Sequence, residues 1–359
     1  MTTIKINNKI IGFGHPAYII AEIGCNFDGS LDRAKMLAKL AKESGADALK
    51  IQNFLASKLV SQKGFEGVKL AHQQKWKKST TEVYKEAEFP REWLQELSDY
   101  CKSINIDFFS SPYDIDAVDE LEKIGVPAYK IGSGEIDNLE FLRYVAEKQK
   151  PIIIACGASS IEEIRQALSV VRETGNQQVV LLQCTTNYPS MLADSNLNAM
   201  VSLKKEFGIE VGLSDHTVGK EGGGDDPFNG ITAPMTMVAL GGVVIEKHFT
   251  DDNKRKGNDH PFAMNADDFK VMVDSMRAVE KALGGGQKRV LDSEKETAII
   301  QRRGIYAKED IEAGEEITHD KIEFLRPALF MRPPQVKNIL GKKTKYKINK
   351  GDPIKPDVV

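Results

Sequence analysis

The 359-residue chain lacks the marks of a secreted, membrane-spanning or nucleic-acid-binding protein. Its cysteines (Cys25, Cys101, Cys156 and Cys184) are widely spaced without a CxxC pair, which argues against a disulfide framework or zinc knuckle and fits a reducing cytoplasm. No run approaches about 18 apolar residues, and the first residues lack a signal-peptide core. A net charge of −3 gives no general attraction to nucleic acid or anionic membrane. We expect a cytoplasmic protein with neither partner, in which an anionic substrate needs a local cluster of cations.

Short apolar, β-rich segments recur along the first 250 residues, most of them followed by a helical pattern. They read AYIIAEIG (17–24), ALKIQNF (48–54), DFFSSP (107–112), AYKIGSG (128–134), PIIIACG (151–157), VVLLQCT (179–185), VGLSDH (211–216) and VVIEKHF (243–249). Near-continuous apolar runs are typical of strands covered on both faces, as in a parallel sheet. Eight β-then-α units predict an α/β fold, a closed (β/α)8 TIM barrel. An open doubly wound sheet is the competing interpretation, which the lack of GxGxxG after the first strand disfavours.

The texture of the sequence changes after the triple glycine at 284–286. We expect a barrel domain over 1–286, a linker over 287–303 and a small β-rich domain over 304–359. Inside the last, the pattern Ile-x-x-Gly-Glu-x-Ile starting at Ile311 returns as Ile-x-x-Gly-Asp-x-Ile starting at Ile348, which predicts two pseudo-symmetric β-turn-β halves.

Two segments of the predicted barrel break its rhythm. Residues 55–106 are too long for one connecting helix and are predicted to add a helix and a lid over the barrel mouth. Residues 218–232 are rich in glycine and acidic residues but lack the Gly-Lys-Ser/Thr ending of a phosphate loop. They are typical of a mobile surface loop.

Polar residues gather at one end of nearly every predicted strand. Catalytic groups of such barrels lie at the carboxyl ends of the strands, whereas a strand buried on both faces should otherwise avoid charge. A ring of such residues therefore predicts an active site. Its members are Glu22, Lys50, Gln52, Ser110, Ser111, Lys130, Ser133, Glu135, Gln183, Thr185, Asp215, His216, Glu246 and His248.

The charges of this ring suit an anionic substrate. Lys50 and Lys130 supply two cations for phosphate and carboxylate oxygens, while Glu22 and Glu135 are candidates for proton transfer. The alternative is that each lysine merely pairs with one of these glutamates, because buried charges are usually paired.

His216 and His248 follow adjacent predicted strands, so they are candidates for sharing one divalent metal that polarises a carbonyl. The alternative for each is a hydrogen-bonded structural histidine. Cys156 and Cys184, also near strand ends, are expected to be small buried apolar residues, because no neighbouring cation pattern marks either as a thiolate.

These motifs together resemble the sialic acid (nonulosonate) synthase family. The likeness covers nearly the whole chain, and its C-terminal part resembles the antifreeze-like (SAF, β-clip) domain of that family. The motifs are IAEIGCNFDGS, ALKIQ, FFSSPYD, AYKIGSGE, GLSDHT, EKHFTDD and DHPFAMNADDF, followed by YAKEDIEAGEEI, FLRP, LGKK and INKGDPI.

The resemblance implies an enzyme that condenses phosphoenolpyruvate with the open-chain aldehyde of an N-acetylated hexosamine, with phosphate released by C–O cleavage. It implies a divalent cation, Mn²⁺ or Mg²⁺, held by His216 and His248. Glu22 would lie beside that metal as a proton-transfer group, and Glu135 near the reacting face of phosphoenolpyruvate. The product would be a precursor of surface polysaccharide.

The resemblance also implies the substrate contacts. Phosphoenolpyruvate would contact Lys50, Lys130 and Ser133. Arg326 would reach from the antifreeze-like domain of one subunit into the barrel of the other, in a domain-swapped homodimer. The remaining contacts implied are Gln52, Ser111, Tyr188 and, for sugar hydroxyls, Asp259.

The chain departs from the family pattern near the substrate. Where Asn-His and Ser-Thr-Gly are common, it has Asn26-Phe27 and Ala155-Cys156-Gly157, so a serine hydroxyl expected at the phosphate is missing. Backbone N–H groups or Ser159 are the candidate replacements. These changes leave the sugar open: a 6-deoxy-diacetamido hexose, as in legionaminate or pseudaminate synthesis, is the alternative acceptor, and a non-catalytic carbohydrate-binding protein is the alternative of another class.

Overall fold

The computed structural model describes residues 4–66 and 78–359, which fall into two compact units, Met1–Gly284 and Gly285–Val359. The first unit holds parallel strands in the order β5-β4-β3-β10-β9-β8-β7-β6, and β5 and β6 contact each other so that the ring is nearly closed. The eight-strand barrel predicted from the apolar segments is confirmed. Its strands are β3 (Tyr18–Glu22), β4 (Ala48–Asn53), β5 (Asp107–Pro112), β6 (Tyr129–Ile131), β7 (Ile152–Ala155), β8 (Val179–Cys184), β9 (Glu210–Asp215) and β10 (Val244–Thr250).

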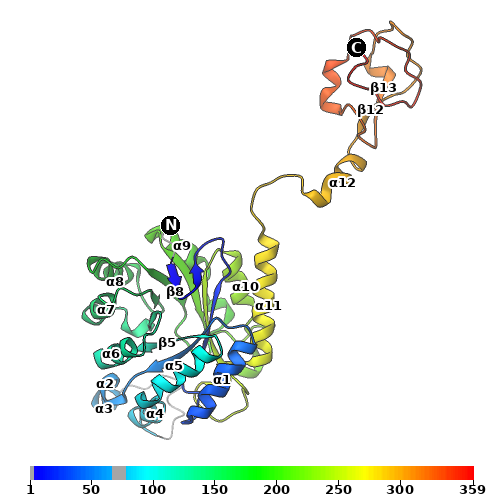
Figure 1. The fold of residues 1–359 in the computed structure, drawn as a ribbon. Helices are drawn as coiled ribbons and strands as arrows, with labels where there is room; N and C mark the ends of the chain where they lie inside the picture. Colours follow the sequence, from blue (N-terminus) through cyan, green and yellow to red (C-terminus); the bar gives the residue numbers. More distant parts are fainter. Residues whose placement is uncertain (1–3, 67–77) are drawn as a thin grey trace. The chain divides into compact units, whose positions relative to one another are not determined.

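A helix follows each strand and packs on the outside of the ring (Figure 1). Polar side chains begin several of these helices by accepting a hydrogen bond from a first-turn amide: Ser30 accepts from Arg33, and Ser160 and Glu163 form a capping box. The outer helices are α1 (Leu31–Glu43), α5 (Leu94–Ser103), α6 (Ile115–Lys123), α7 (Leu139–Ala146), α8 (Ile161–Glu173), α9 (Asn198–Phe207), α10 (Thr232–Ala239) and α11 (Ala266–Leu283).

A hairpin that the sequence interpretation did not include covers the amino end of the barrel. Strands β1 (Ile4–Ile6) and β2 (Lys9–Ile11) pair antiparallel, and Lys9 bonds to Asp47, just before β4, at 2.8 Å. Ile4, Ile6 and Ile11 of the hairpin are almost fully buried, so this end of the barrel is sealed and the open rim is the opposite one.

The long connection between β4 and β5 holds several short helices. They are α2 (Ala56–Leu59), α3 (Gln62–Phe65), α4 (Thr80–Glu86) and the 3-10 turn η2 (Arg91–Trp93). Tyr84 of α4 packs on Phe54, at the carboxyl end of β4, with ring centroids 5.7 Å apart. One extra helix was predicted here; the central part of the predicted lid, residues 67–77, lies outside the described residues.

The glycine-rich segment 218–232 is anchored, which differs from the loose surface loop expected of its composition. Asp226 is only 1% exposed and accepts hydrogen bonds from the amides of Phe228 and Thr232 and from the Thr232 hydroxyl. Because Thr232 begins α10, these bonds tie the loop to the barrel. A further turn, η5 (Lys220–Gly222), lies inside the loop.

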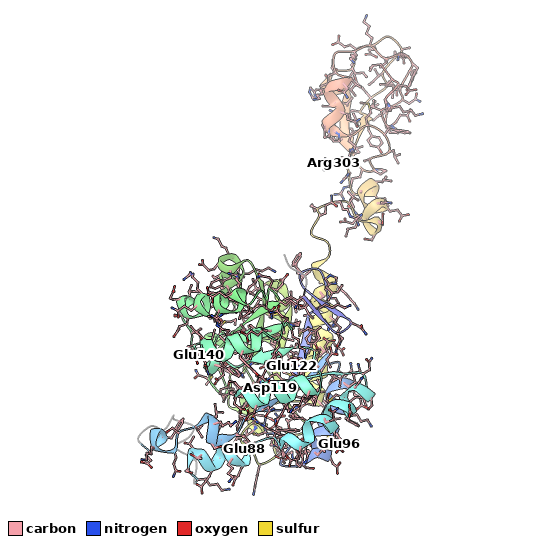
Figure 2. All side chains as sticks on the ribbon, turned by 60° about the vertical axis from the view of Figure 1, so that its left-hand side comes forward. Glu88, Glu96, Asp119, Glu122, Glu140 and Arg303 are labelled. Carbon is pink, nitrogen blue, oxygen red and sulfur yellow. The ribbon has the colours of Figure 1, made fainter. Side chains whose placement is uncertain are left out.

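Ion pairs lie on the surface of the outer helices. Glu96 of α5 pairs with Lys35 at 2.5 Å and Asp119 of α6 with Lys148 at 3.1 Å (Figure 2). Such pairs contribute little each, so the barrel is stabilised mainly by its apolar core.

The second unit is a small β-rich domain with its own core. Strands β12 (Gly304–Ala307) and β13 (Ile322–Leu325) pair antiparallel, and the segment 287–303, expected as a linker, carries helix α12 (Lys295–Ile300). The internal repeat folds as predicted: Ile311 and Ile348 form a β-bridge with each other, and both are buried. The glycines at 314 and 351 take the same positive φ, +82° and +85°, so both copies make the same turn.

The remaining short elements complete the description. Strand β11 (Met264–Asn265) pairs with β10, and the other 3-10 turns are η3 (Ser133–Glu135), η4 (Leu192–Asp194), η6 (His260–Phe262), η7 (Asp292–Glu294), η8 (His319–Lys321) and η9 (Pro333–Asn338). Among helices of residues 4–66 and 78–359, none combines the length and apolarity that crossing a membrane requires.

Candidate active site

Two buried lysines and two buried glutamates meet inside the barrel at the carboxyl ends of its strands. Lys50 on β4 contacts Glu22 on β3, and its Nζ lies 3.8 Å from Glu246 on β10. Lys130 on β6 lies 3.2 Å from the same Glu246. Glu246 therefore bridges the two cations, and all four side chains are at most 7% exposed.

The sequence interpretation left open whether each lysine pairs with Glu22 or Glu135. The structure answers in part: Lys50 pairs with Glu22, whereas the partner of Lys130 is Glu246. No ion pair joins Glu135 to either lysine within the described residues. Glu246 was noted at its strand end but given no role, because its position between lysines on β4 and β6 depends on closure of the barrel.

Neutral donors complete the surroundings of the two carboxylates. Gln52 and the Gly24 amide donate to Glu22 at 3.2 and 2.9 Å, and Ser214 donates to Glu246 at 3.2 Å. Lys50 also donates to Ser111 at 3.1 Å. The predicted residues Glu22, Lys50, Gln52 and Ser111 thus form one connected network.

The two carboxyl groups differ in acidity. Burial raises the pKa of Glu22, and the nearby Glu246 charge adds to this, although Lys50 opposes it. Burial acts on Glu246 in the same direction, but the charges of Lys130 and Lys50 outweigh it and hold the pKa of Glu246 below its usual value. Two neighbouring carboxyl groups whose pKa values are shifted in opposite directions suit different tasks. Glu246 is a fixed anion, and Glu22 is the group better able to carry a proton.

The two histidines predicted to share a metal face each other. Their ring centroids are 5.4 Å apart, and both side chains are almost fully buried. Tyr188 packs on His216 at 4.3 Å, and Phe262 packs on His248 at 5.1 Å. An aromatic wall of Tyr188 and Phe262 therefore lies against the histidine pair.

The histidine pair fits a divalent cation. His216 Nδ1 lies 2.9 Å from the Thr185 carbonyl oxygen, which sets this nitrogen as the donor and leaves Nε2 with a lone pair. Among the residues that the structure describes, the buried His248 Nδ1 has no hydrogen-bond partner, and burial holds the pKa of His248 well below its usual value, so that its ring is neutral. Among described residues no cluster of three or more His, Cys, Asp or Glu forms a metal site, so other ligands would come from water and substrate.

Comparisons with known proteins agree with this geometry. The profile of the NeuB family matches residues 37–288, and the SAF domain profile matches residues 302–359. The chain belongs to the NeuB family. The family and the C-terminal domain predicted from the motifs are thereby confirmed.

The NeuB-family relatives are similar over nearly their whole length. The chain is 38% identical over 353 residues to N,N'-diacetyllegionaminic acid synthase of Legionella pneumophila, covering 97% of this chain and 96% of the relative. It is 36% identical over 338 residues to pseudaminic acid synthase of Campylobacter jejuni, with 94% and 95% covered. The crystal structure of N-acetylneuraminic acid (sialic acid) synthetase from Leptospira borgpetersenii superposes with a TM-score of 0.71 at 29% identity, covering 82% of this chain and 95% of that one.

The other predicted residues of this NeuB-family site are placed as follows. Asp259 Oδ2 lies 3.6 Å from His248 Nδ1 and accepts from the Cys25 amide, so Asp259 lies at the histidine pair. Glu135 is half-buried in η3, where burial raises its pKa. Arg326 is exposed and belongs to the second unit.

The surroundings of Gly157 show which groups lie near the missing serine hydroxyl. Its amide donates to Ser133 at 3.0 Å, and a Cβ at Gly157 would lie 2.1 Å from the Thr186 hydroxyl oxygen. Of the proposed replacements, the Gly157 amide is thus already engaged, and the Ser159 hydroxyl donates to the Gly157 carbonyl at 3.0 Å. Thr186 also supplies a hydroxyl here, which the sequence interpretation did not consider as a replacement for the serine.

The two strand-end cysteines differ from each other. Cys156 behaves as the expected small buried residue, because burial raises the pKa of its thiol to about 12. Cys184 is likewise buried, as expected, but its thiol lies near basic groups that the sequence pattern does not show. Burial also acts to raise its pKa, but His216, 3.9 Å from the sulfur, and the charge of Lys130 lower it to about 7. The contact between Cys184 and His216 joins two residues that are 32 positions apart in sequence, so the sequence gives no local signal of it.

Proposed function

We propose that this protein is a nonulosonate synthase that condenses phosphoenolpyruvate with the open-chain aldehyde of an N-acetylated hexosamine. The observation that carries the proposal is the convergence, on one rim of the barrel, of two buried lysines and two facing histidines. The NeuB-family relatives are synthases of three nonulosonic acids, which supports the same class of product. The four free cysteines support a cytoplasmic location.

Lys50 and Lys130 are the groups proposed to bind phosphoenolpyruvate. Their ammonium groups are buried, so their attraction to phosphate and carboxylate oxygens is little screened by water. Glu246 lies between them and orients both, Ser111 offers a hydroxyl beside Lys50, and Ser133, which follows β6, accepts from the Gly157 amide.

His216 and His248 are proposed to hold Mn²⁺ or Mg²⁺, with Asp259 next to the pair. A divalent cation supplies Lewis-acid polarisation of a carbonyl when bound. Of the chain's own residues, Tyr188 and Phe262 pack beside the pair, and Asp259 offers a carboxylate to sugar hydroxyls.

Glu22 is proposed as the proton-transfer group. As the new C–C bond forms, the aldehyde oxygen becomes a hydroxyl and must gain a proton, while the water that replaces phosphate must lose one. Glu22 lies within the lysine network, and burial raises its pKa, so it takes up a proton more readily than an exposed carboxylate does. Gln52 and the Gly24 amide fix its orientation.

A 6-deoxy-diacetamido hexose is the second candidate acceptor. The relatives at 38% and 36% identity are named as synthases of diacetyllegionaminic and pseudaminic acid, which favours it. The aromatic pair Tyr188 and Phe262, with centroids 5.3 Å apart beside the histidines, offers an apolar surface to a methyl group.

A phosphate-release assay tests the function. We expect release only when phosphoenolpyruvate, a suitable amino-sugar aldehyde and a divalent cation are all present. A panel of N-acetylmannosamine and the 6-deoxy-diacetamido hexoses would identify the acceptor by the highest kcat/KM. Sugar binding without phosphate release on any acceptor would contradict the proposal.

The protein is further proposed to act as a domain-swapped homodimer in which Arg326 completes the partner's site. Arg326 is exposed, and no ion pair engages it among the described residues. Mixed dimers of Arg326→Ala and His248→Ala subunits should regain activity, because the intact barrel of the first then receives the intact Arg326 of the second. At random mixing we expect about one quarter of wild-type activity. Failure of separately inactive variants to complement each other would contradict the exchange.

A further inference from the structure

Neighbouring strands β9 and β10 present two successive cross-strand pairs of polar residues. In register, Ser214 lies opposite Glu246 and Asp215 opposite Lys247. Side chains alternate between the two faces of a strand. Because Glu246 reaches the lysines inside the barrel, Asp215 and Lys247 must point outward, toward the helices.

The outward pair is buried and fully engaged. Lys247 Nζ lies 2.5 Å from Asp215 Oδ2 and donates to the carbonyl oxygens of Thr217 and Gly230. Asp215 accepts from both the amide and the hydroxyl of Thr217, at 3.0 Å each. Lys247 is 1% exposed and Asp215 is 3% exposed. Each residue immediately precedes one of the two facing histidines.

The pair interrupts an otherwise apolar outer face. The preceding outward positions are Val211 and Leu213 on β9 and Ile245 on β10, all of them buried. An apolar pair would fill such a space at least as stably, because desolvation offsets most of the attraction between two buried charges. Stability alone therefore does not account for charges at this place.

The pair also fixes the loop that follows His216. Gly230 takes a φ of +81°, and a Cβ there would lie 2.7 Å from Lys247 Nζ and 2.5 Å from the Thr217 carbonyl oxygen. Lys247 thus joins the end of β10 to both ends of the turn 217–230. The backbone on either side of the histidine pair is held by one ammonium group.

We propose that the buried Asp215–Lys247 ion pair is a positioning element that holds His216 and His248 at the separation needed to share one cation. The inference rests on the proposed metal site of this protein. The pair touches neither substrate nor cation. It acts by locking the two strand ends from which the imidazoles project.

The test compares Mn²⁺ affinity of the full chain with and without the pair. In the double variant Asp215→Asn/Lys247→Met, both charges are removed with little change in volume, so no buried charge is left alone. We expect the dissociation constant for Mn²⁺, measured by electron paramagnetic resonance without substrates, to rise about 10- to 100-fold. The Mn²⁺ concentration for half-maximal activity should rise in step, while KM for phosphoenolpyruvate at saturating Mn²⁺ stays near wild type.

Lys204→Met is the matched control. Lys204 pairs with the buried Glu210 at 2.8 Å, at the amino end of the same strand β9. We expect this variant to lose thermal stability and to keep wild-type Mn²⁺ affinity. Lys247→Arg, which retains the charge, should recover part of the affinity that the double variant loses.

The outcomes separate this inference from the metal site itself. Wild-type binding of Mn²⁺ that is lost in His216→Ala supports the metal site. If the double variant then unfolds at the wild-type temperature and binds Mn²⁺ as tightly as the wild type, the positioning role is overturned. If the wild type itself binds no Mn²⁺, the proposed metal site is overturned, and the inference with it.

Discussion

Replacement of His248 by alanine is expected to lower the rate of phosphate release at least about 1,000-fold, because loss of Lewis-acid polarisation removes several kcal/mol of transition-state stabilisation. The imidazole packs against His216 and Phe262, and within the described residues its Nδ1 has no hydrogen-bond partner, so alanine removes one of the two proposed metal ligands. The rate would be measured with saturating substrates over a range of Mn²⁺ concentrations.

Circular dichroism and thermal unfolding must show that the His248→Ala variant keeps the barrel. His15→Ala is a suitable control, because His15 is exposed in the loop before β3 and should be dispensable. Normal turnover by the His248→Ala variant would refute the assignment of the metal to this pair.

Replacement of Glu22 by glutamine is expected to lower kcat about 100- to 10,000-fold, the usual range for loss of a proton-transfer group. Glutamine has the same shape and can still accept from the Gly24 amide, so binding of phosphoenolpyruvate and Mn²⁺ should change little. Kinetics that separate kcat from KM would distinguish this loss from weaker binding.

The pH dependence of kcat sharpens the same prediction. Burial raises the pKa of Glu22, so the wild-type profile should contain a limb from a carboxyl group that titrates above the ordinary carboxyl range. That limb should be missing in the Glu22→Gln variant. Glu210→Gln, which changes a buried carboxylate at the opposite end of the barrel, should leave the profile unchanged. An unaltered acid limb in Glu22→Gln would assign the proton transfer to another group.

The barrel, and the polar residues at the carboxyl ends of its strands, can be predicted from local sequence patterns. A strand covered on both faces needs an uninterrupted apolar run, and a charged residue at the end of such a run, such as Lys50 or Glu22, is conspicuous. The repeat around Ile311 and Ile348 is likewise visible, because one turn geometry demands glycine at the same place in both copies.

The hairpin at the amino end was missed for a physical reason. Its strands are three residues each, too short for periodicity to distinguish them from a loop. The anchoring of the glycine-rich loop was missed because free and fixed loops are both rich in glycine and aspartate, so composition does not distinguish them. The burial of Asp226 in the structure shows that this loop is fixed.

The sequence by itself determined which strands form the barrel, in what order they follow, and which chemical groups stand at their ends, because these depend on residues adjacent along the chain. The tertiary structure alone decided which of these groups touch. The bridging of Lys50 and Lys130 by Glu246, the Cys184–His216 contact and the outward Asp215–Lys247 pair all join different strands. The register between parallel strands and the closure of the ring set such contacts, and both arise from packing of the whole barrel.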